Sequence, residues 1–201
     1  MMVNMAVAID EAWLPTTLTA PPMTDEEFAE FCAENPDYFI ETTAEGELLI
    51  MPPAFSLTSA RNHEIAVQLG IWARREGSGA VTDASGGFVL PNGARRSPGA
   101  AWTLKRRLPR DVEGYWHLSP DFVVELRSDS DRLATLREKM REWVDNGTRL
   151  AWLIDPERRA VEVYRPGRVA ETFENLDTIV GEDPVAGFEL DLRRVGDPIG
   201  G

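Results

Sequence analysis

The sequence predicts a single acidic α/β domain in which a mixed central β-sheet is flanked by helices. The chain has 201 residues, a length that fits one domain. Hydrophobic residues make up 43% of the chain, which is enough to form a real core. Helical and strand patterns follow one another along the sequence, and a sheet covered by helices is the natural packing for that order.

The first 60 residues predict an extended arm, a short helix and a hairpin. The arm covers residues 1–22, which contain three prolines and show no hydrophobic period. Thr24 and Glu27 form a capping-box pattern, which indicates that a helix begins there. Residues 38–43 and 47–53 are two strand-like runs separated by a short turn, and this pattern is typical of a β-hairpin.

The middle of the chain predicts a longer helix followed by short strands. The helix covers residues 57–76, and its apolar stripe contains Ile65, Leu69 and Trp72. Three strand candidates follow it, separated by turn signals that include Pro91-Asn92-Gly93. They are residues 80–85, 87–91 and 100–104.

The last 80 residues contain the clearest strand and the clearest helix. Residues 120–127 form a nearly continuous apolar strand. The helix over residues 131–146 has an apolar face that ends at an Asn146-Gly147 cap. A second hairpin is expected from residues 149–155 and 160–166, and the tail over residues 169–192 is expected to add one or two edge strands.

The net charge of −13 is unevenly distributed. Residues 1–60 contain 11 acidic residues and no Lys or Arg, whereas residues 61–168 contain 19 basic and 15 acidic residues, a net of +4. An acidic protein is a poor non-specific binder of nucleic acid, because it releases few counterions. The basic middle segment is compatible either with a local positive groove or with ordinary surface charge.

The cysteine count and the hydropathy of the chain bound its environment. The single cysteine, Cys32, excludes an internal disulfide and a thiolate metal cluster. The first 15 residues lack the basic start of a signal peptide. No stretch reaches the roughly 18 apolar residues that a membrane span needs. We therefore expect a soluble, cytoplasmic protein.

Glu125 is the most unusual residue of the sequence, because it lies inside an otherwise apolar strand. A charge in that place costs free energy unless it is paired or bound to a metal. An ion pair with an arginine and a metal site both remain possible from the residues alone. The nearby Asp121 is a poor second ligand, since four strand residues span roughly 13 Å. Arg127 shares the face of Glu125 at about 7 Å and can stabilise phosphate charge.

Six segments of the chain, in the same order, resemble the Uma-two family of restriction endonucleases, which belongs to the PD-(D/E)XK nuclease superfamily. The resemblance runs from about residue 24 to residue 192 and implies a restriction-endonuclease-like domain over residues 23–192, with an arm before it and a tail over residues 193–201. The segments are RNHEI, GGFVLPNGARRSPGAAW, SPDFVVELRS, EKMREW, NGTRLAWLID and VEVYRP.

The resemblance implies a metal-dependent endonuclease that hydrolyses phosphodiester bonds of DNA with Mg²⁺ or Mn²⁺. Glu125 is similar to the metal-binding acid of the family. Lys139 resembles a catalytic lysine that has moved to the following helix, and Glu64 resembles the helix acid that orients metal or water. Arg127 is a candidate for binding a substrate phosphate. Relatives with this fold often form dimers, so a homodimer is expected.

One residue departs from the family pattern. The pattern has an aspartate after the proline of the segment RRSPGAAW, and this chain has Gly99. Glycine supplies no side-chain oxygen, so the second metal carboxylate is missing, and Asp83 is a weak candidate to replace it. Gly99 supports an alternative function: a catalytically inactive nuclease fold that binds a partner or dimerises.

Overall fold

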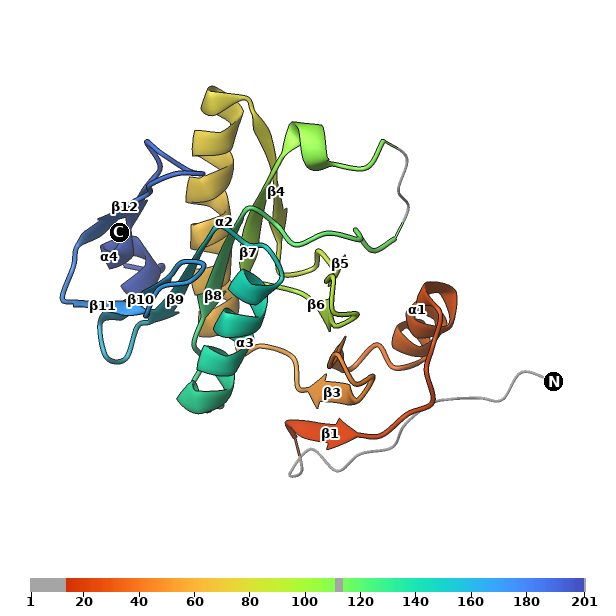
Figure 1. Ribbon diagram of the computed structural model, residues 1–201. Coiled ribbons are helices and arrows are strands. Elements are labelled where there is room, and N and C mark those ends of the chain that lie inside the picture. Colours follow the sequence, from red (N-terminus) through yellow and green to blue (C-terminus); the bar gives the residue numbers. More distant parts are fainter. Residues whose placement is uncertain (1–13, 111–113, 201) are drawn as a thin grey trace. The chain divides into compact units, whose positions relative to one another are not determined.

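The computed structural model describes residues 14–110 and 114–200, and the contacts of the chain divide them into two compact units. Unit 1 contains residues 14–54, 87–97 and 114–118, and unit 2 contains the remaining described residues. The ribbon of Figure 1 labels most of the elements of both units. Most of the predicted arm, residues 1–13, lies outside the described residues.

Unit 1 is built from one helix and a five-stranded sheet. Helix α1 spans Asp25–Glu34, and its predicted capping box is confirmed, because Thr24 and Glu27 exchange side-chain and backbone hydrogen bonds. The strand order of the sheet is β1-β3-β2-β6-β5. These strands are β1 (Thr16–Leu18), β2 (Phe39–Thr42), β3 (Leu48–Met51), β5 (Phe88–Val89) and β6 (Arg95–Arg96).

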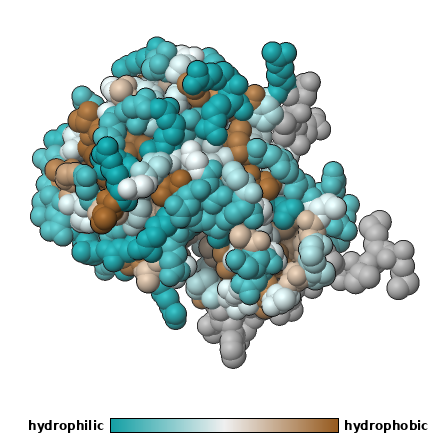
Figure 2. Space-filling model, in the orientation of Figure 1, coloured by the Kyte–Doolittle hydropathy of each residue, from teal (hydrophilic) through white to brown (hydrophobic). Residues whose placement is uncertain are grey.

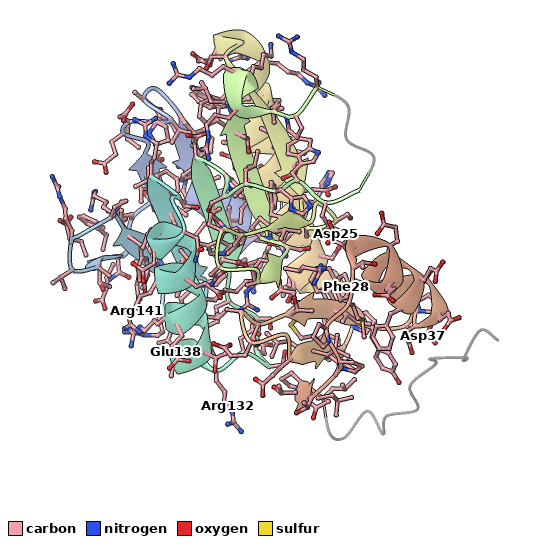
Figure 3. All side chains as sticks on the ribbon, turned by 45° about the vertical axis from the view of Figure 1, so that its right-hand side comes forward. Asp25, Phe28, Asp37, Arg132, Glu138 and Arg141 are labelled. Carbon is pink, nitrogen blue, oxygen red and sulfur yellow. The ribbon has the colours of Figure 1, made fainter. Side chains whose placement is uncertain are left out.

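The core of unit 1 is small and is supplemented by a partly buried charge pair. Phe28 and Phe31 of α1 pack with Leu48 and Ile50 of β3. The guanidinium of Arg95 lies over the ring of Phe28 and also binds Asp25, the first residue of α1. Figure 3 labels Asp25 and Phe28 on this helix. These contacts tie α1 to the sheet through apolar packing and charge together.

Unit 2 contains a six-stranded mixed sheet of order β11-β10-β9-β8-β7-β4. Strands β8 and β9 are parallel, and the other neighbouring pairs are antiparallel. The prediction of a mixed central sheet flanked by helices is therefore confirmed. The strands are β4 (Gly79–Asp83), β7 (Ala100–Leu104), β8 (Phe122–Leu126), β9 (Leu150–Asp155), β10 (Ala160–Tyr164) and β11 (Glu171–Glu174).

Helices cover the two faces of this sheet. Helix α2 (Ser56–Glu76) packs through Ile65 and Leu69 on a core that includes Val124, whereas α3 (Leu133–Asp145) contacts the next residue of β8, Glu125. Successive strand residues point to opposite faces, so α2 and α3 lie on opposite sides of the sheet. The remaining elements are a 3₁₀ turn (Lys105–Arg107), β12 (Thr178–Val180), β13 (Glu189–Asp191) and α4 (Leu192–Gly196).

The structure differs from the sequence prediction at two places. The strand candidates over residues 80–104 separate into two sheets, since β5 pairs with β6 in unit 1 while β4 and β7 pair in unit 2. The tail forms three strands rather than one or two, because β12 and β13 pair with each other in a separate two-stranded sheet.

The surface is mainly polar on the face that Figure 2 shows, where hydrophobic residues are scattered in small groups. No helix in the described part of the chain is long and apolar enough to cross a membrane.

Candidate active site

Glu125 lies near the end of β8, a strand whose five residues are all buried. Its residue surface is only 6% exposed. Strands β7 and β9 flank β8 on its two sides, so the backbone of this strand is fixed by hydrogen bonds in both directions. The sheet therefore holds a carboxylate in a rigid, largely dry position.

Two side chains of α3 contact the same oxygen of Glu125. The ammonium of Lys139 lies 2.9 Å from Oε1, and the indole nitrogen of Trp143 donates a hydrogen bond to Oε1 at 3.0 Å. Residues four apart on a helix lie on the same face, so one face of α3 supplies both groups. Their exposed neighbours Glu138 and Arg141 project from the helix elsewhere (Figure 3).

Gly99 lies beside Glu125 at the same end of the sheet. Ala100 of β7 pairs with Val124 of β8 in an antiparallel ladder. Gly99 and Glu125 are therefore each one residue beyond this last pair, where the chain at Gly99 bends away from the ladder. The position that the resemblance assigned to the second ligand therefore lies opposite Glu125 in the backbone register, one residue beyond the last β7–β8 pair.

The space beside Gly99 is taken by Asn62 of α2. A Cβ atom built on Gly99 would lie 2.7 Å from Oδ1 of Asn62 and 3.1 Å from the backbone oxygen of Val124. Oδ1 of Asn62 is buried and has no hydrogen-bond partner among the described residues. Asn62 was not among the predicted site residues, although its spacing from Ile65 and Leu69 places it on the buried stripe of α2.

The comparisons with known proteins decide the family. The model of the family Uma2, described as "Putative restriction endonuclease", matches residues 25–193. The chain belongs to the Uma2 family. The resemblance found in the sequence is therefore confirmed.

A solved structure supports the fold of this Uma2 protein. It is the crystal structure of a "putative nuclease" of the family DUF820 from Anabaena variabilis, with a TM-score of 0.73 and 22% sequence identity. The match covers 87% of this chain and 98% of the other. At this identity the likeness is one of fold alone. No curated protein matches the chain.

Glu64, the third residue that the resemblance implied, faces elsewhere on α2. Its carboxylate accepts a hydrogen bond from Gln68 at 3.0 Å, and Gln68 in turn binds the backbone of Asp191. Residues two apart on a helix are about 200° apart around its axis. The Uma2 chain therefore presents Asn62, and not Glu64, towards Gly99.

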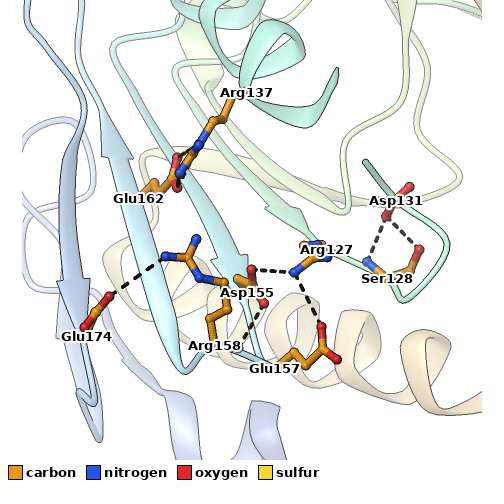
Figure 4. Close-up of polar contacts among 9 residues, drawn as sticks. All are labelled: Arg127, Ser128, Asp131, Arg137, Asp155, Glu157, Arg158, Glu162 and Glu174. Carbon is orange, nitrogen blue, oxygen red and sulfur yellow. Dashed lines mark hydrogen bonds and ion pairs between the residues drawn. The ribbon is translucent and has the colours of Figure 1, made fainter. Parts of the chain in front are cut away.

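Arg127 is held by acidic partners just beyond β8. Its guanidinium contacts Asp155 at 2.9 Å and Glu157 at 3.5 Å (Figure 4). The hydrogen bond that Arg127 donates to Asp155 raises the pKa of Arg127 above its usual value, so its charge is permanent. The role of Arg127 in binding a substrate phosphate stays a prediction. It requires that the phosphate bind the guanidinium either together with these two carboxylates or in their place.

Asp121 serves the fold, in keeping with its position before β8. Its buried carboxylate accepts a hydrogen bond from the backbone nitrogen of Leu104 at 2.9 Å and pairs with Arg107 at 2.8 Å. Asp83, the weak candidate for a replacement ligand, is exposed and accepts a hydrogen bond from the backbone nitrogen of Ser85. Both acids therefore have local structural partners.

The oxygen donors at this end of the sheet fit a hard divalent cation. Within residues 14–110 and 114–200 no group of three or more His, Cys, Asp or Glu side chains could hold a metal ion. Mg²⁺ does not need such a group, because it is commonly bound by one or two carboxylates together with waters and substrate phosphates. The Glu125 carboxylate is a donor of this kind.

Proposed function

We propose that this Uma2 protein is a DNA endonuclease that depends on a divalent metal ion and hydrolyses phosphodiester bonds at the end of β8. The observation that carries the proposal is the buried Glu125 carboxylate with the Lys139 ammonium 2.9 Å away. A carboxylate and an amine that meet in a rigid, dry site are the groups that this hydrolysis needs.

Glu125 would hold the metal, which we propose to be Mg²⁺ or Mn²⁺. When bound, such an ion polarises the phosphodiester and lowers the pKa of an attacking water. Trp143 fixes the orientation of the carboxylate through its hydrogen bond to Oε1. The burial of Glu125 excludes bulk water from the carboxylate and strengthens its interaction with a cation.

Lys139 supplies a positive charge that the protein keeps in place before substrate binds. Its side chain is 15% exposed, so its position is set by packing on α3 and by Glu125. We propose that the ammonium orients the attacking water and stabilises the negative charge that grows on the phosphate oxygens. Removal of one preorganised donor of this kind costs about 10²- to 10³-fold in kcat.

The proposed substrate and the proposed oligomeric state rest on the family to which the chain belongs, and not on a contact in the structure. A restriction-endonuclease family implies DNA as the substrate, and the basic segment over residues 61–168 supports this proposal because its net charge is +4. We also propose a homodimer, which light scattering on the purified protein will test.

Gly99 favours a second candidate function, in which the protein keeps the nuclease fold but does not cleave DNA. The missing carboxylate leaves Glu125 as the acid at this end of β8, and loss of a hard ligand weakens Mg²⁺ binding. Such a protein would act by binding DNA or a protein partner.

Cleavage of supercoiled plasmid separates the two candidates. The proposed endonuclease nicks plasmid in Mg²⁺ or Mn²⁺, does not do so in EDTA, and loses at least about 100-fold of its rate on Glu125→Ala. If the wild type leaves the plasmid intact with either metal while Gly99→Asp cuts it, the endonuclease proposal fails and the inactive-fold candidate stands.

A further inference from the structure

Two buried acids lie in one row across the six-stranded sheet, on the face that α3 contacts. Leu153 of β9 pairs with Glu125 of β8 on one side and with Glu162 of β10 on the other. Paired residues of neighbouring strands point to the same face, and the strands lie about 4.8 Å apart, so the backbones of the two acids are about 10 Å apart. Glu125 is 6% exposed and Glu162 is 5% exposed. The row therefore holds two largely dry carboxylates with an apolar residue between them.

Helix α3 supplies a separate cation to each acid of this row. The ammonium of Lys139 contacts Glu125 at 2.9 Å. The guanidinium Nε of Arg137 lies 3.0 Å from each carboxylate oxygen of Glu162, a contact that Figure 4 shows. The hydroxyl of Tyr164, on the same strand as Glu162, also donates to this carboxylate at 2.7 Å. Because Glu162 has two donors from different elements, its carboxylate is a fixed acceptor for Arg137.

The two cations leave α3 on opposite flanks of its buried stripe. Met140 is fully buried and marks this stripe. At about 100° per residue, Lys139 lies about 100° to one side of Met140, and Arg137 lies about 60° to the other side. Helix α3 packs on β9 and β10. A rotation of the helix about its own axis that brings one cation closer to its acid therefore lifts the other cation away, so the two contacts together fix this rotation.

We propose that Arg137 and Glu162, with Tyr164, are positioning residues that set the rotation of α3 and so hold the Lys139 ammonium on Glu125. The inference rests on the roles proposed above for Glu125 and Lys139, and it adds residues that act only through α3. A misplacement of about 1 Å in a catalytic group can cost about 100-fold in rate, so the rotation of this helix matters to the proposed reaction.

The reactivity of Lys139 towards acetic anhydride reports its position without using activity. A lysine that is held in a buried ion pair reacts slowly. The chain has two lysines, and the exposed Lys105 is an internal reference in the same sample. The measured quantity is the acetylation rate of Lys139 divided by that of Lys105, obtained by mass spectrometry of the digested protein. Glu125→Gln, which removes the charged partner of Lys139, gives the upper limit of this ratio.

An apolar replacement separates the positioning role from stability. Arg137→Leu, Glu162→Leu and Tyr164→Phe, made together, remove the directional contacts, and a buried ion pair replaced by apolar residues often leaves stability unchanged or raises it. The acetylation ratio should rise by about two- to thirtyfold, the range that couplings of this kind span. Arg141→Leu is the matched control, because it removes an exposed arginine from the same helix and should leave the ratio unchanged.

Two single variants complete the test. Glu162→Gln should raise the ratio in the same direction, since an amide binds Arg137 more weakly than a carboxylate does. Gly79→Ala, which is expected to destabilise the other edge of the sheet, should leave the ratio unchanged. A ratio that changes by less than about twofold in both the triple variant and Glu162→Gln overturns the inference. An equal rise in Gly79→Ala also overturns it, because the effect then comes from lost stability.

Plasmid cleavage is scored separately from acetylation. A rise in the ratio together with no cleavage by the wild type supports the positioning of Lys139 and defeats only the endonuclease proposal. Cleavage by the wild type together with an unchanged ratio leaves the proposed function standing and overturns the positioning role.

Discussion

Replacement of Lys139 by methionine should destabilise the protein more than the loss of an ordinary surface lysine. The side chains of Lys139 and Glu125 are 15% and 8% exposed, so Lys139→Met leaves a buried carboxylate without its cation. Breaking a buried pair from one side costs about 3–5 kcal/mol. The hydrogen bond from Trp143 remains and offsets part of this cost, so we expect a loss of about 3 kcal/mol.

Thermal and urea unfolding measure this loss. For a chain of this size about 3 kcal/mol corresponds to a fall of about 6–12 °C in Tm. Lys105 is the matched control, since it is the other lysine of the sequence and its side chain is exposed, with one hydrogen bond to the backbone oxygen of Gly77. Lys105→Met should change stability by less than about 1 kcal/mol. Equal effects of the two substitutions would refute the energetic role of the Lys139–Glu125 pair.

Three further results are expected. Gly79→Ala should lower the free energy of unfolding by about 1–3 kcal/mol, because a Cβ there would lie 2.0 Å from the buried ring of Trp102. Gly70→Ala should raise the free energy of unfolding by up to about 1 kcal/mol, since a Cβ there meets open space in the middle of α2. If chemical denaturation shows that both glycine substitutions change the free energy of unfolding in the same direction, this description of the packing is contradicted. The third concerns Glu162, which contacts Arg137 as Figure 4 shows. Burial raises the pKa of Glu162, but hydrogen bonds from Arg137 and Tyr164 outweigh burial and hold the pKa below its usual value. The stability that this group adds is present above its unfolded pKa of about 4.3 and is lost as pH falls through the lower folded pKa. Glu162→Gln should therefore flatten the loss of stability between about pH 5 and pH 3, and an unchanged acid limb in pH-dependent unfolding would argue against the assignment.

The elements that were predicted well carry their signal in neighbouring residues. The capping box of Thr24 and Glu27 marked the start of α1, and the apolar face with its Asn146-Gly147 cap marked α3. The single charge inside β8 singled out Glu125 for the same reason, since a buried acid is rare in an apolar run. These patterns are local, so the sequence displays them directly.

The elements that were predicted poorly depend on distant pairing. Strand β6 consists of Arg95 and Arg96 and has no apolar pattern, because Glu41 of β2 supplies the buried partner of Arg96. The division of the chain into two units follows from such contacts between remote segments. The short segments that connect these strands carry no sequence signal that predicts which of the two sheets a strand joins.

The candidate site shows the same limit. Glu125 and Lys139 were named from the sequence, and the structure places them in contact. Asn62 was not named, because an asparagine on a helix is unremarkable until the fold sets it against Gly99. Arg127 follows the last residue of β8, and its contact with Asp155 at the end of β9 could not be predicted from the local pattern.

The most direct test of the metal site is a crystal structure of the wild-type protein soaked in Mn²⁺ and recorded at a wavelength that gives anomalous scattering from manganese. The proposed site predicts one strong anomalous peak about 2.1 Å from a carboxylate oxygen of Glu125. A fully soaked crystal in which Glu125 keeps its contact with Lys139 and no peak lies at this end of β8 would contradict the account.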